Sequence, residues 1–167
     1  NYTHQTRYQL PIPPSPNLPN MKSIYLYPST CFFEATPVSL GRGTSLPFQV
    51  YGHPNMTGYN YSFTPRSIPG AKNPPQLNKL CHGVDLSNMS DEEIWKRGVD
   101  LTYVIDAYRN LNLDDHFFRP FFELLVGRDY VRKMIKEGKS ADEIKAMWKG
   151  DVEKFKAQRK PYLLYEE

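Results

Sequence analysis

The sequence contains only two cysteines, Cys31 and Cys81, and neither has another cysteine or a histidine nearby at the spacing of metal ligands. A structural zinc site is therefore not predicted, because such a site needs four closely grouped thiolate or imidazole ligands. Either the two cysteines form a disulfide, which requires an oxidising compartment, or both are buried free thiols. The sequence leaves these two interpretations open.

Signatures of several other protein classes are absent. The chain has no apolar run of the roughly 20 residues that a membrane span needs. It also has no phosphate-binding loop, Gly-x-Ser-x-Gly elbow or His-x-x-x-His pattern. Its net charge of +3 comes from 21 basic and 18 acidic residues that are interleaved along the chain. We therefore predict no membrane span, no nucleic-acid partner, no metal and no cofactor.

The first 20 residues lack an initiating methionine and a signal-peptide pattern, so we expect the chain to be part of a longer protein. Five prolines between residues 9 and 20 exclude a helix and favour an extended path. We interpret residues 1–20 as a proline-rich connector or rim strand that holds Ser15 and Asn17 in fixed positions, because proline restricts the backbone. A plain interdomain linker is the alternative.

A single domain is expected over residues 21–167, because a chain of this size buries roughly 70% of its unfolded surface. Between residues 44 and 86, β-prone stretches alternate with Gly, Pro and Asn clusters, which predicts a small mixed or antiparallel sheet. The stretches are PFQVYG, YNYSFTPRSI and KLCHGVDL. Pro65 and Pro69 indicate that the middle stretch is an edge strand or contains a bulge.

Two capping boxes begin predicted helices in the second half of the chain. Ser90 with Glu93 starts a helix of roughly 91–110, and Ser140 with Glu143 starts one that runs to about 158. For this last helix, the apolar spacing predicts a buried face made of Ile144, Trp148, Val152 and Phe155.

Two shorter helices complete the prediction. One runs from 128 to 137 and stops before Gly138, and another covers residues 20–27 and is ended by Pro28. The Phe-rich stretch FFRPFFELL at 117–125 is interpreted as a hydrophobic junction between the helices and the sheet. A sheet followed by helices defines an α+β fold.

Glu34 and Arg42 are isolated charges in an otherwise apolar segment. Arg42 lies between two glycines, which permit positive φ and a close approach of the backbone to a ligand. Arginine can also fork onto a carboxylate with two parallel hydrogen bonds. The spacing alone, however, favours an ion pair between Arg42 and Glu34 that satisfies both charges. Glu34 follows two phenylalanines, so it is either an acid whose pKa desolvation raises or a structural hydrogen-bond acceptor.

The 12 tyrosines and 9 phenylalanines are compatible with a carbohydrate site. Sugar C–H faces stack on aromatic rings, while Asn, Arg and Glu side chains bind the hydroxyls. Most of these aromatic residues are nevertheless expected in the core.

Four stretches carry a resemblance to a known family: PPSPNLP, YPSTCFFEATPVSLGRGTSLPFQVYGHP, KLCHGVDL and GKSADEIKAMWKGDVEKFKAQRKPYLLY. In this order, over nearly the whole chain, they resemble the C-terminal half of the bacterial exo-β-N-acetylmuramidases, formerly a domain of unknown function. Most members of that family have Gly where this chain has Ala35 and Glu where it has Leu40. These departures lie beside Glu34 and Arg42 and leave the charged residues in place.

The resemblance implies a two-domain glycoside hydrolase in which an N-terminal Rossmann-like domain precedes this domain and the substrate lies between them. Such enzymes release N-acetylmuramic acid from the non-reducing end of peptidoglycan fragments, which implies a periplasmic or extracellular location. The resemblance also implies that residues 1–20 form the rim of the cleft and that five residues line one of its walls. Arg42 would contact the lactyl carboxylate of the sugar. Glu34 would either bind sugar hydroxyls or act as a catalytic carboxylate. The five are Ser15, Asn17, Glu34, Arg42 and Thr44.

Cleavage of a glycosidic bond usually needs two carboxyl groups, and Glu34 is the one good candidate in the sequence. We therefore expect the principal acid in the N-terminal domain and no activity from this chain alone. Two rival functions remain: a non-catalytic glycan-binding or scaffolding module, and a structural dimerisation domain that uses the Phe-rich junction.

Overall fold

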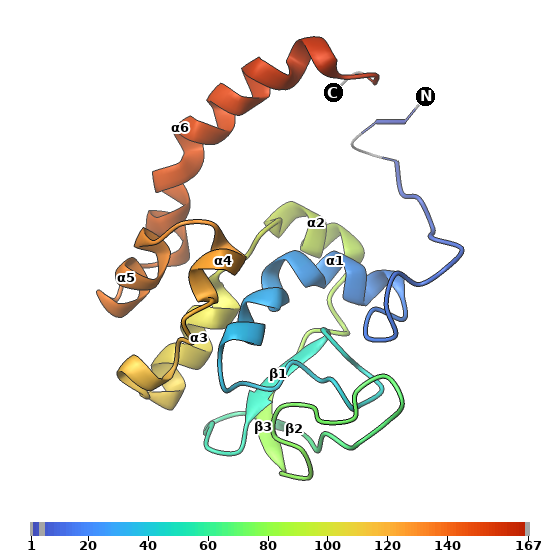
Figure 1. Ribbon diagram of the computed structural model, residues 1–167, viewed down its shortest axis with the longest axis vertical. Helices are drawn as coiled ribbons and strands as arrows, with labels where there is room; N and C mark the ends of the chain where they lie inside the picture. The colour runs from blue at the N-terminus through green and yellow to red at the C-terminus, as the bar shows by residue number, and fades with distance from the viewer. Residues whose placement is uncertain (1, 4–5, 166–167) are drawn as a thin grey trace.

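The computed structural model describes residues 2–3 and 6–165. A small antiparallel sheet forms one end of the molecule, and α-helices cover it and extend away from it (Figure 1). The strands are β1 (Val50–His53), β2 (Tyr61–Phe63) and β3 (Cys81–Asp85), in the order β1-β3-β2. The predicted α+β class, with its sheet in the first half and helices in the second, is confirmed.

The sheet separates two apolar clusters because successive side chains of a strand point to opposite faces. Val50 packs with Phe63 and Cys81 on one face. Its neighbour Tyr51 faces the main core, where its ring stacks on Phe33 at a centroid distance of 4.8 Å. As predicted from its prolines, the middle stretch forms only a short edge strand, β2.

The first helix, α1 (Met21–Thr30), does not end before Pro28 as predicted, but continues through it into the 3₁₀ helix η1 (Cys31–Ala35). A proline in the last turn removes one backbone donor, and side-chain hydrogen bonds fix the two residues that follow it. Ser29 Oγ donates to the carbonyl of Gly98 at 3.1 Å, and Thr30 Oγ1 donates to that of Leu26 at 3.0 Å.

The single helix predicted over 91–110 is instead two helices, α2 (Asp91–Arg97) and α3 (Thr102–Leu111). Gly98 takes a φ of 59°, which ends α2, and the buried carboxylate of Asp100 then accepts the backbone N–H of Thr102 at 2.8 Å to begin α3. Because the α1 residue Ser29 also accepts the N–H of Asp100, at 2.9 Å, a tertiary contact fixes the break.

The remaining helices are α4 (Phe122–Val126), α5 (Tyr130–Lys136) and α6 (Ala141–Arg159), with short 3₁₀ turns η2 (Asp114–His116) and η3 (Lys160–Tyr162). None of the helices in the described ranges combines the length and apolar character that a membrane crossing requires. The capping box at Ser140 and Glu143 is confirmed at the start of α6.

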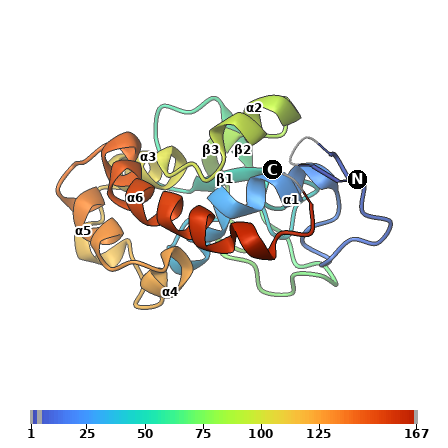
Figure 2. The same ribbon diagram turned by 90° about the horizontal axis from the view of Figure 1, so that it is seen from above.

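The predicted buried face of α6 is wrong beyond its first turns. Ile144 is fully buried, but the side chains of Val152 and Phe155 are 42% and 60% exposed. The reason is visible in Figures 1 and 2, where α6 leaves the helical layer after α5 and projects away from the sheet, so no other element covers its far half.

The Phe-rich stretch is largely buried. Phe117, Phe118 and Phe122 belong to the main core, and Phe122 packs against Phe32 of η1 at a ring distance of 6.4 Å. The stretch was predicted to join the helices to the sheet, whereas its ring contacts join α3 and α4 to η1. Phe121 and Leu124 of the same stretch are exposed.

Cys31 and Cys81 are free thiols, which answers the question that the sequence left open. Burial raises the pKa of each thiol to about 11. For Cys31, the nearby Glu34 carboxylate contributes to this rise after burial, because a negative charge disfavours the thiolate.

Candidate functional site

Glu34 and Arg42 form an ion pair at the surface, between η1 and the loop that precedes β1. The pair predicted from the spacing is therefore present. Its side chains remain 23% and 35% exposed, respectively, so the guanidinium is neither sealed inside the domain nor free of internal contacts. This combination leaves Arg42 held in place and still accessible from solvent.

The Gly-Arg-Gly-Thr loop owes its shape to its two glycines. Gly41 and Gly43 have φ values of 80° and 81°, as predicted. A Cβ on Gly43 would lie 2.3 Å from the carbonyl oxygen of Arg66, and one on Gly41 would lie 2.5 Å from that of Leu46. The close approach is thus to the chain's own backbone, and both glycines are buried, so the expected exposed backbone site for a ligand is not present.

The Arg42 guanidinium lies over an aromatic ring as well as beside a carboxylate. Its Cζ atom is 5.2 Å from the ring centroid of the fully buried Phe48, within the range of a cation–π interaction. Among the described residues, the buried Nε of Arg42 has no hydrogen-bond partner. Contacts with Glu34 and Phe48 therefore restrain the guanidinium, while its Nε donor is unused.

Tyr27 is a site residue that the sequence analysis missed. Its partly exposed ring lies 5.1 Å from that of Phe48. Burial and the Glu34 carboxylate both raise the pKa of its phenol, whereas Arg42 lowers it. Tyr27, Cys31 and Glu34 follow one another at helical spacings of four and three residues. This spacing places the three side chains on one face only if the helix continues past Pro28. A helix that ends at Pro28, as the sequence predicts, would not bring them together.

Thr44 serves the loop itself. Its Oγ1 donates to the carbonyl of Gly41 at 2.7 Å and accepts the N–H of Leu46 at 3.0 Å. Since a hydroxyl has one donor and two acceptor lone pairs, one lone pair remains for another partner.

Ser15 and Asn17 lie on the proline-rich segment. Ser15 Oγ accepts the N–H of Asn17 at 3.2 Å, and Asn17 Nδ2 donates to the carbonyl of Gly70 at 2.9 Å. The loop that contains Gly70 also contacts the arginine loop, because the Arg66 N–H donates to the carbonyl of Gly43 at 2.9 Å. The described contacts thus connect the rim segment to the Arg42 loop through residues 66–70.

Another carboxylate, Asp106 of α3, is engaged in the core region. Its Oδ2 accepts hydrogen bonds from the phenols of Tyr51 and Tyr59, each at 2.8 Å. Burial and this carboxylate raise the pKa of both phenols. The described residues contain no group of three or more His, Cys, Asp or Glu side chains that could hold a metal ion.

The surface around Glu34 and Arg42 therefore combines one cation, one carboxylate and the phenol of Tyr27. A guanidinium suits a carboxylate ligand, and a phenol ring can contact a sugar face. One carboxylate is fewer than glycosidic cleavage requires. The charged and aromatic groups are of the kinds that an acidic sugar engages, and Glu34 is the carboxylate beside them.

Comparison with known proteins identifies the family of this chain. The family model described as exo-beta-N-acetylmuramidase NamZ, C-terminal, matches residues 25–165. The peptidoglycan beta-N-acetylmuramidase NamZ of Bacillus subtilis (strain 168) is 33% identical over an alignment that covers 91% of this chain and 40% of the Bacillus protein.

Two solved structures are also similar. A crystal structure of a DUF1343 family protein from Bacteroides fragilis NCTC 9343 is 83% identical, with a TM-score of 0.98, and the match covers 100% of this chain and 47% of the other. A second DUF1343 family protein from the same organism is 20% identical with a TM-score of 0.64, covering 93% of this chain and 45% of its own, and shows the fold alone. This chain therefore spans less than half the length of these relatives.

The family match extends over most of the chain and includes Tyr27, Glu34 and Arg42. The chain accordingly belongs to the family of the C-terminal domain of the exo-beta-N-acetylmuramidase NamZ.

Proposed function

We propose that this chain forms one wall of the substrate cleft in an exo-acting glycoside hydrolase that releases N-acetylmuramic acid from the non-reducing end of peptidoglycan fragments. Family membership supports the proposal, as does the name of the Bacillus relative, a peptidoglycan beta-N-acetylmuramidase. The other wall is an N-terminal Rossmann-like domain. Because the substrate is cell-wall material, the complete enzyme works in the periplasm or outside the cell.

The accessible guanidinium of Arg42 is the observation that carries this proposal. N-acetylmuramic acid differs from N-acetylglucosamine by a lactyl ether that bears a carboxylate. Contacts with Glu34 and Phe48 restrain the guanidinium, and a guanidinium can bind a carboxylate through two parallel hydrogen bonds. Arg42 therefore selects the muramic acid, while Ser15, Asn17 and Thr44 supply polar contacts along the wall.

Glu34 is the carboxylate that this wall contributes. It acts either as a ligand for sugar hydroxyls or as one member of the pair that cleaves the bond. The second carboxylate, and with it the principal acid, comes from the N-terminal domain. The chain by itself is then inactive and gains activity only in the complete enzyme.

Substitution of Arg42 by lysine in the complete enzyme tests the proposal. Lysine keeps the positive charge but cannot donate two parallel hydrogen bonds to a carboxylate. We therefore expect kcat/KM for a muramic-acid-terminated fragment to fall by about 10- to 100-fold, which corresponds to the free energy of one charged hydrogen bond. Arg66→Lys is the matched control, because the side chain of Arg66 is exposed and donates to Asn78 Oδ1 at 3.1 Å, away from Glu34. Unchanged activity of the Arg42→Lys enzyme would reject the carboxylate role.

Calorimetry separates the enzyme from a non-catalytic glycan-binding module. The experiment titrates a muramic-acid disaccharide into this chain and, separately, into the complete protein. Turnover that occurs only in the complete protein supports the shared active site. Firm binding to this chain combined with no turnover by the complete protein supports the binding module instead.

A further inference from the structure

Phe48 has a backbone conformation that a large side chain does not favour. Its φ is 60°, in the left-handed region that suits glycine. The residue is the second central position of a turn that the Gln49 N–H closes by donating to the carbonyl of Leu46 at 3.2 Å. With Pro47 at the first central position this is a type II turn, in which glycine or asparagine normally follows. A phenylalanine here indicates that its ring has a task that outweighs the strain.

The backbone of Phe48 is joined to the two segments that carry site residues. Its N–H donates to the carbonyl of Leu40, two residues before Arg42, at 2.7 Å. Its carbonyl oxygen lies 3.4 Å from the donor Oγ1 of Thr30, three residues after Tyr27. The strained turn is thus tied to the arginine loop on one side and to the end of α1 on the other.

The ring of Phe48 contacts the same two site residues. The ring of Tyr27 lies 5.1 Å from it, tilted by 48°, and Cζ of Arg42 lies 5.2 Å from its centroid. Phe48 is fully buried, whereas the side chains of Tyr27 and Arg42 are partly exposed. Phe48 therefore does not reach a ligand itself, but it lies beneath two groups that do.

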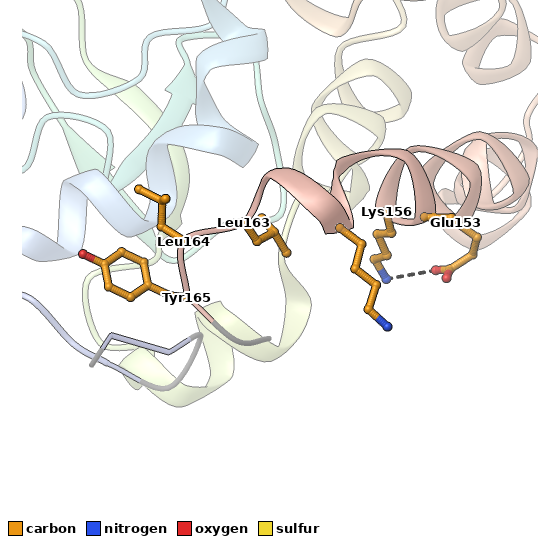
Figure 3. Close-up of a pocket in the computed structure, with 7 residues that line it drawn as sticks. Glu153, Lys156, Leu163, Leu164 and Tyr165 are labelled. Carbon is orange, nitrogen blue, oxygen red and sulfur yellow. Dashed lines mark hydrogen bonds and ion pairs between the residues drawn. The ribbon is translucent and has the colours of Figure 1, made fainter.

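The hollow beside the tail of α6 contains a more exposed ion pair. It has a volume of about 750 Å³ and is lined by the end of α6 and by residues up to Tyr165 (Figure 3). Its pair, Lys156 with Glu153 at 2.9 Å, has two exposed side chains. Solvent screens such a pair, which is therefore weakly held, whereas the guanidinium of Arg42 lies over a buried ring. We accordingly place the recognition of an acidic ligand at Arg42.

We propose that Phe48 is a positioning residue of the acidic-sugar site: its buried ring sets Arg42 against the lactyl carboxylate and Tyr27 against the face of the same sugar. The inference rests on the proposed function, which assigns the carboxylate to Arg42. In N-acetylmuramic acid a short ether joins the carboxylate to the sugar ring. A cation and an aromatic ring held in a fixed relation therefore select this sugar over a neutral one, and Phe48 acts through both.

Calorimetry with the complete encoded protein tests the inference. The two ligands are N-acetylmuramic acid and its lactyl carboxamide, which has nearly the same shape but no charge. The ratio of their affinities is the carboxylate preference of the protein. Phe48→Leu keeps an apolar side chain and removes the ring. We expect it to lower the preference by about 3- to 10-fold, which corresponds to the loss of one cation–π contact.

Phe117→Leu is the matched control. Phe117 is also fully buried, but its ring packs against Tyr108 and Phe118 and belongs to another part of the core. The variant loses the same ring and should leave the carboxylate preference unchanged. A preference that is unchanged in Phe48→Leu, or that falls equally in both variants, would show that Phe48 is only a core residue and would overturn the inference.

Tyr27 variants test the other half of the inference, and they decide it even if Phe48→Leu does not fold, because Tyr27 is partly exposed. Tyr27→Leu removes the ring that faces the sugar and should weaken the acid and the carboxamide alike, by about 2- to 10-fold. Tyr27→Phe keeps the ring and should lose clearly less affinity. Equal losses in the two variants would contradict the ring contact.

Release of N-acetylmuramic acid is assayed in parallel, and the binding measurements do not depend on it. A carboxylate preference that Phe48→Leu lowers, in a protein without turnover, refutes the proposed hydrolase alone. Turnover with a preference that survives in Phe48→Leu refutes the inference alone. A native protein that binds the acid and the carboxamide equally refutes the carboxylate role of Arg42 and the inference together.

Discussion

The guanidinium of Arg42 is held between the carboxylate of Glu34 and the ring of Phe48, and about one third of its side chain still contacts solvent. Two residues eight positions apart in sequence thus form the one arranged charge pair of the candidate site. Arg42 forms an ion pair with Glu34, and its side chain is also partly exposed to solvent. The ion pair that the spacing predicts therefore does not exclude a contact between Arg42 and a ligand.

Glu34→Gln should lower the free energy of unfolding by less than about 1 kcal/mol. Both partners are partly exposed, and partly exposed ion pairs contribute little because solvent screens them. Urea unfolding of this chain measures the change, and Arg42→Gln with the double variant completes the cycle. A coupling of several kcal/mol would show that the pair behaves as a buried one.

Alkylation of Cys31 should be slow at neutral pH and should rise about tenfold per pH unit between pH 8 and 10, because burial and Glu34 raise its thiol pKa to about 11. Glu34→Gln removes a negative charge and should speed the reaction at every pH in this range. Cys81 is the internal control: burial also raises its pKa to about 11, but Glu34 is not among the causes. A parallel change at Cys81 would indicate general loosening.

Gly43→Ala should destabilise the chain more than Gly58→Ala does. Both glycines have positive φ, 81° and 83°, so both variants incur the conformational cost of roughly 1–2 kcal/mol. Only at Gly43 does the new Cβ also collide with a backbone oxygen, that of Arg66, whereas nothing lies within 4 Å at Gly58. Thermal unfolding of both variants gives the difference, and equal losses would contradict the crowding at Gly43.

Asp100→Asn should cost about 1–3 kcal/mol near neutral pH, because this buried carboxylate holds Thr102 and Arg97 at the α2–α3 break. Burial alone would raise the pKa of Asp100, but the hydrogen bonds from Thr102 and Arg97 outweigh it, and the pKa lies below its usual value.

The pH dependence of the Asp100 contribution follows from this sign. A lowered folded pKa means that the contribution is complete above the unfolded pKa, near 3.9, and is lost as the pH falls through the lower folded pKa. The stability difference between the native chain and Asp100→Asn should therefore shrink below about pH 4 in urea titrations. A difference that grows on acidification would contradict the assignment.

The features that the sequence predicted correctly depend on neighbouring residues. Ser140 and Glu143 begin α6 because a capping box needs only four consecutive residues. Gly41 and Gly43 take positive φ because local sterics decide it. The pairing of Arg42 with Glu34 was also favoured by spacing alone, since few other charges lie within reach in that segment.

Tertiary contacts decided the rest. The α1 helix passes Pro28 because Gly98, far along the chain, accepts from Ser29, and the α2–α3 break is fixed by the bond between Ser29 and Asp100. Phe155 matches a buried pattern, yet it is exposed because no described element lies against it. Local backbone geometry and helix capping are encoded within a few consecutive residues. Burial of a side chain depends instead on which other segments pack against it. The apolar spacing of a helix predicts a buried face but does not identify the segment that covers it.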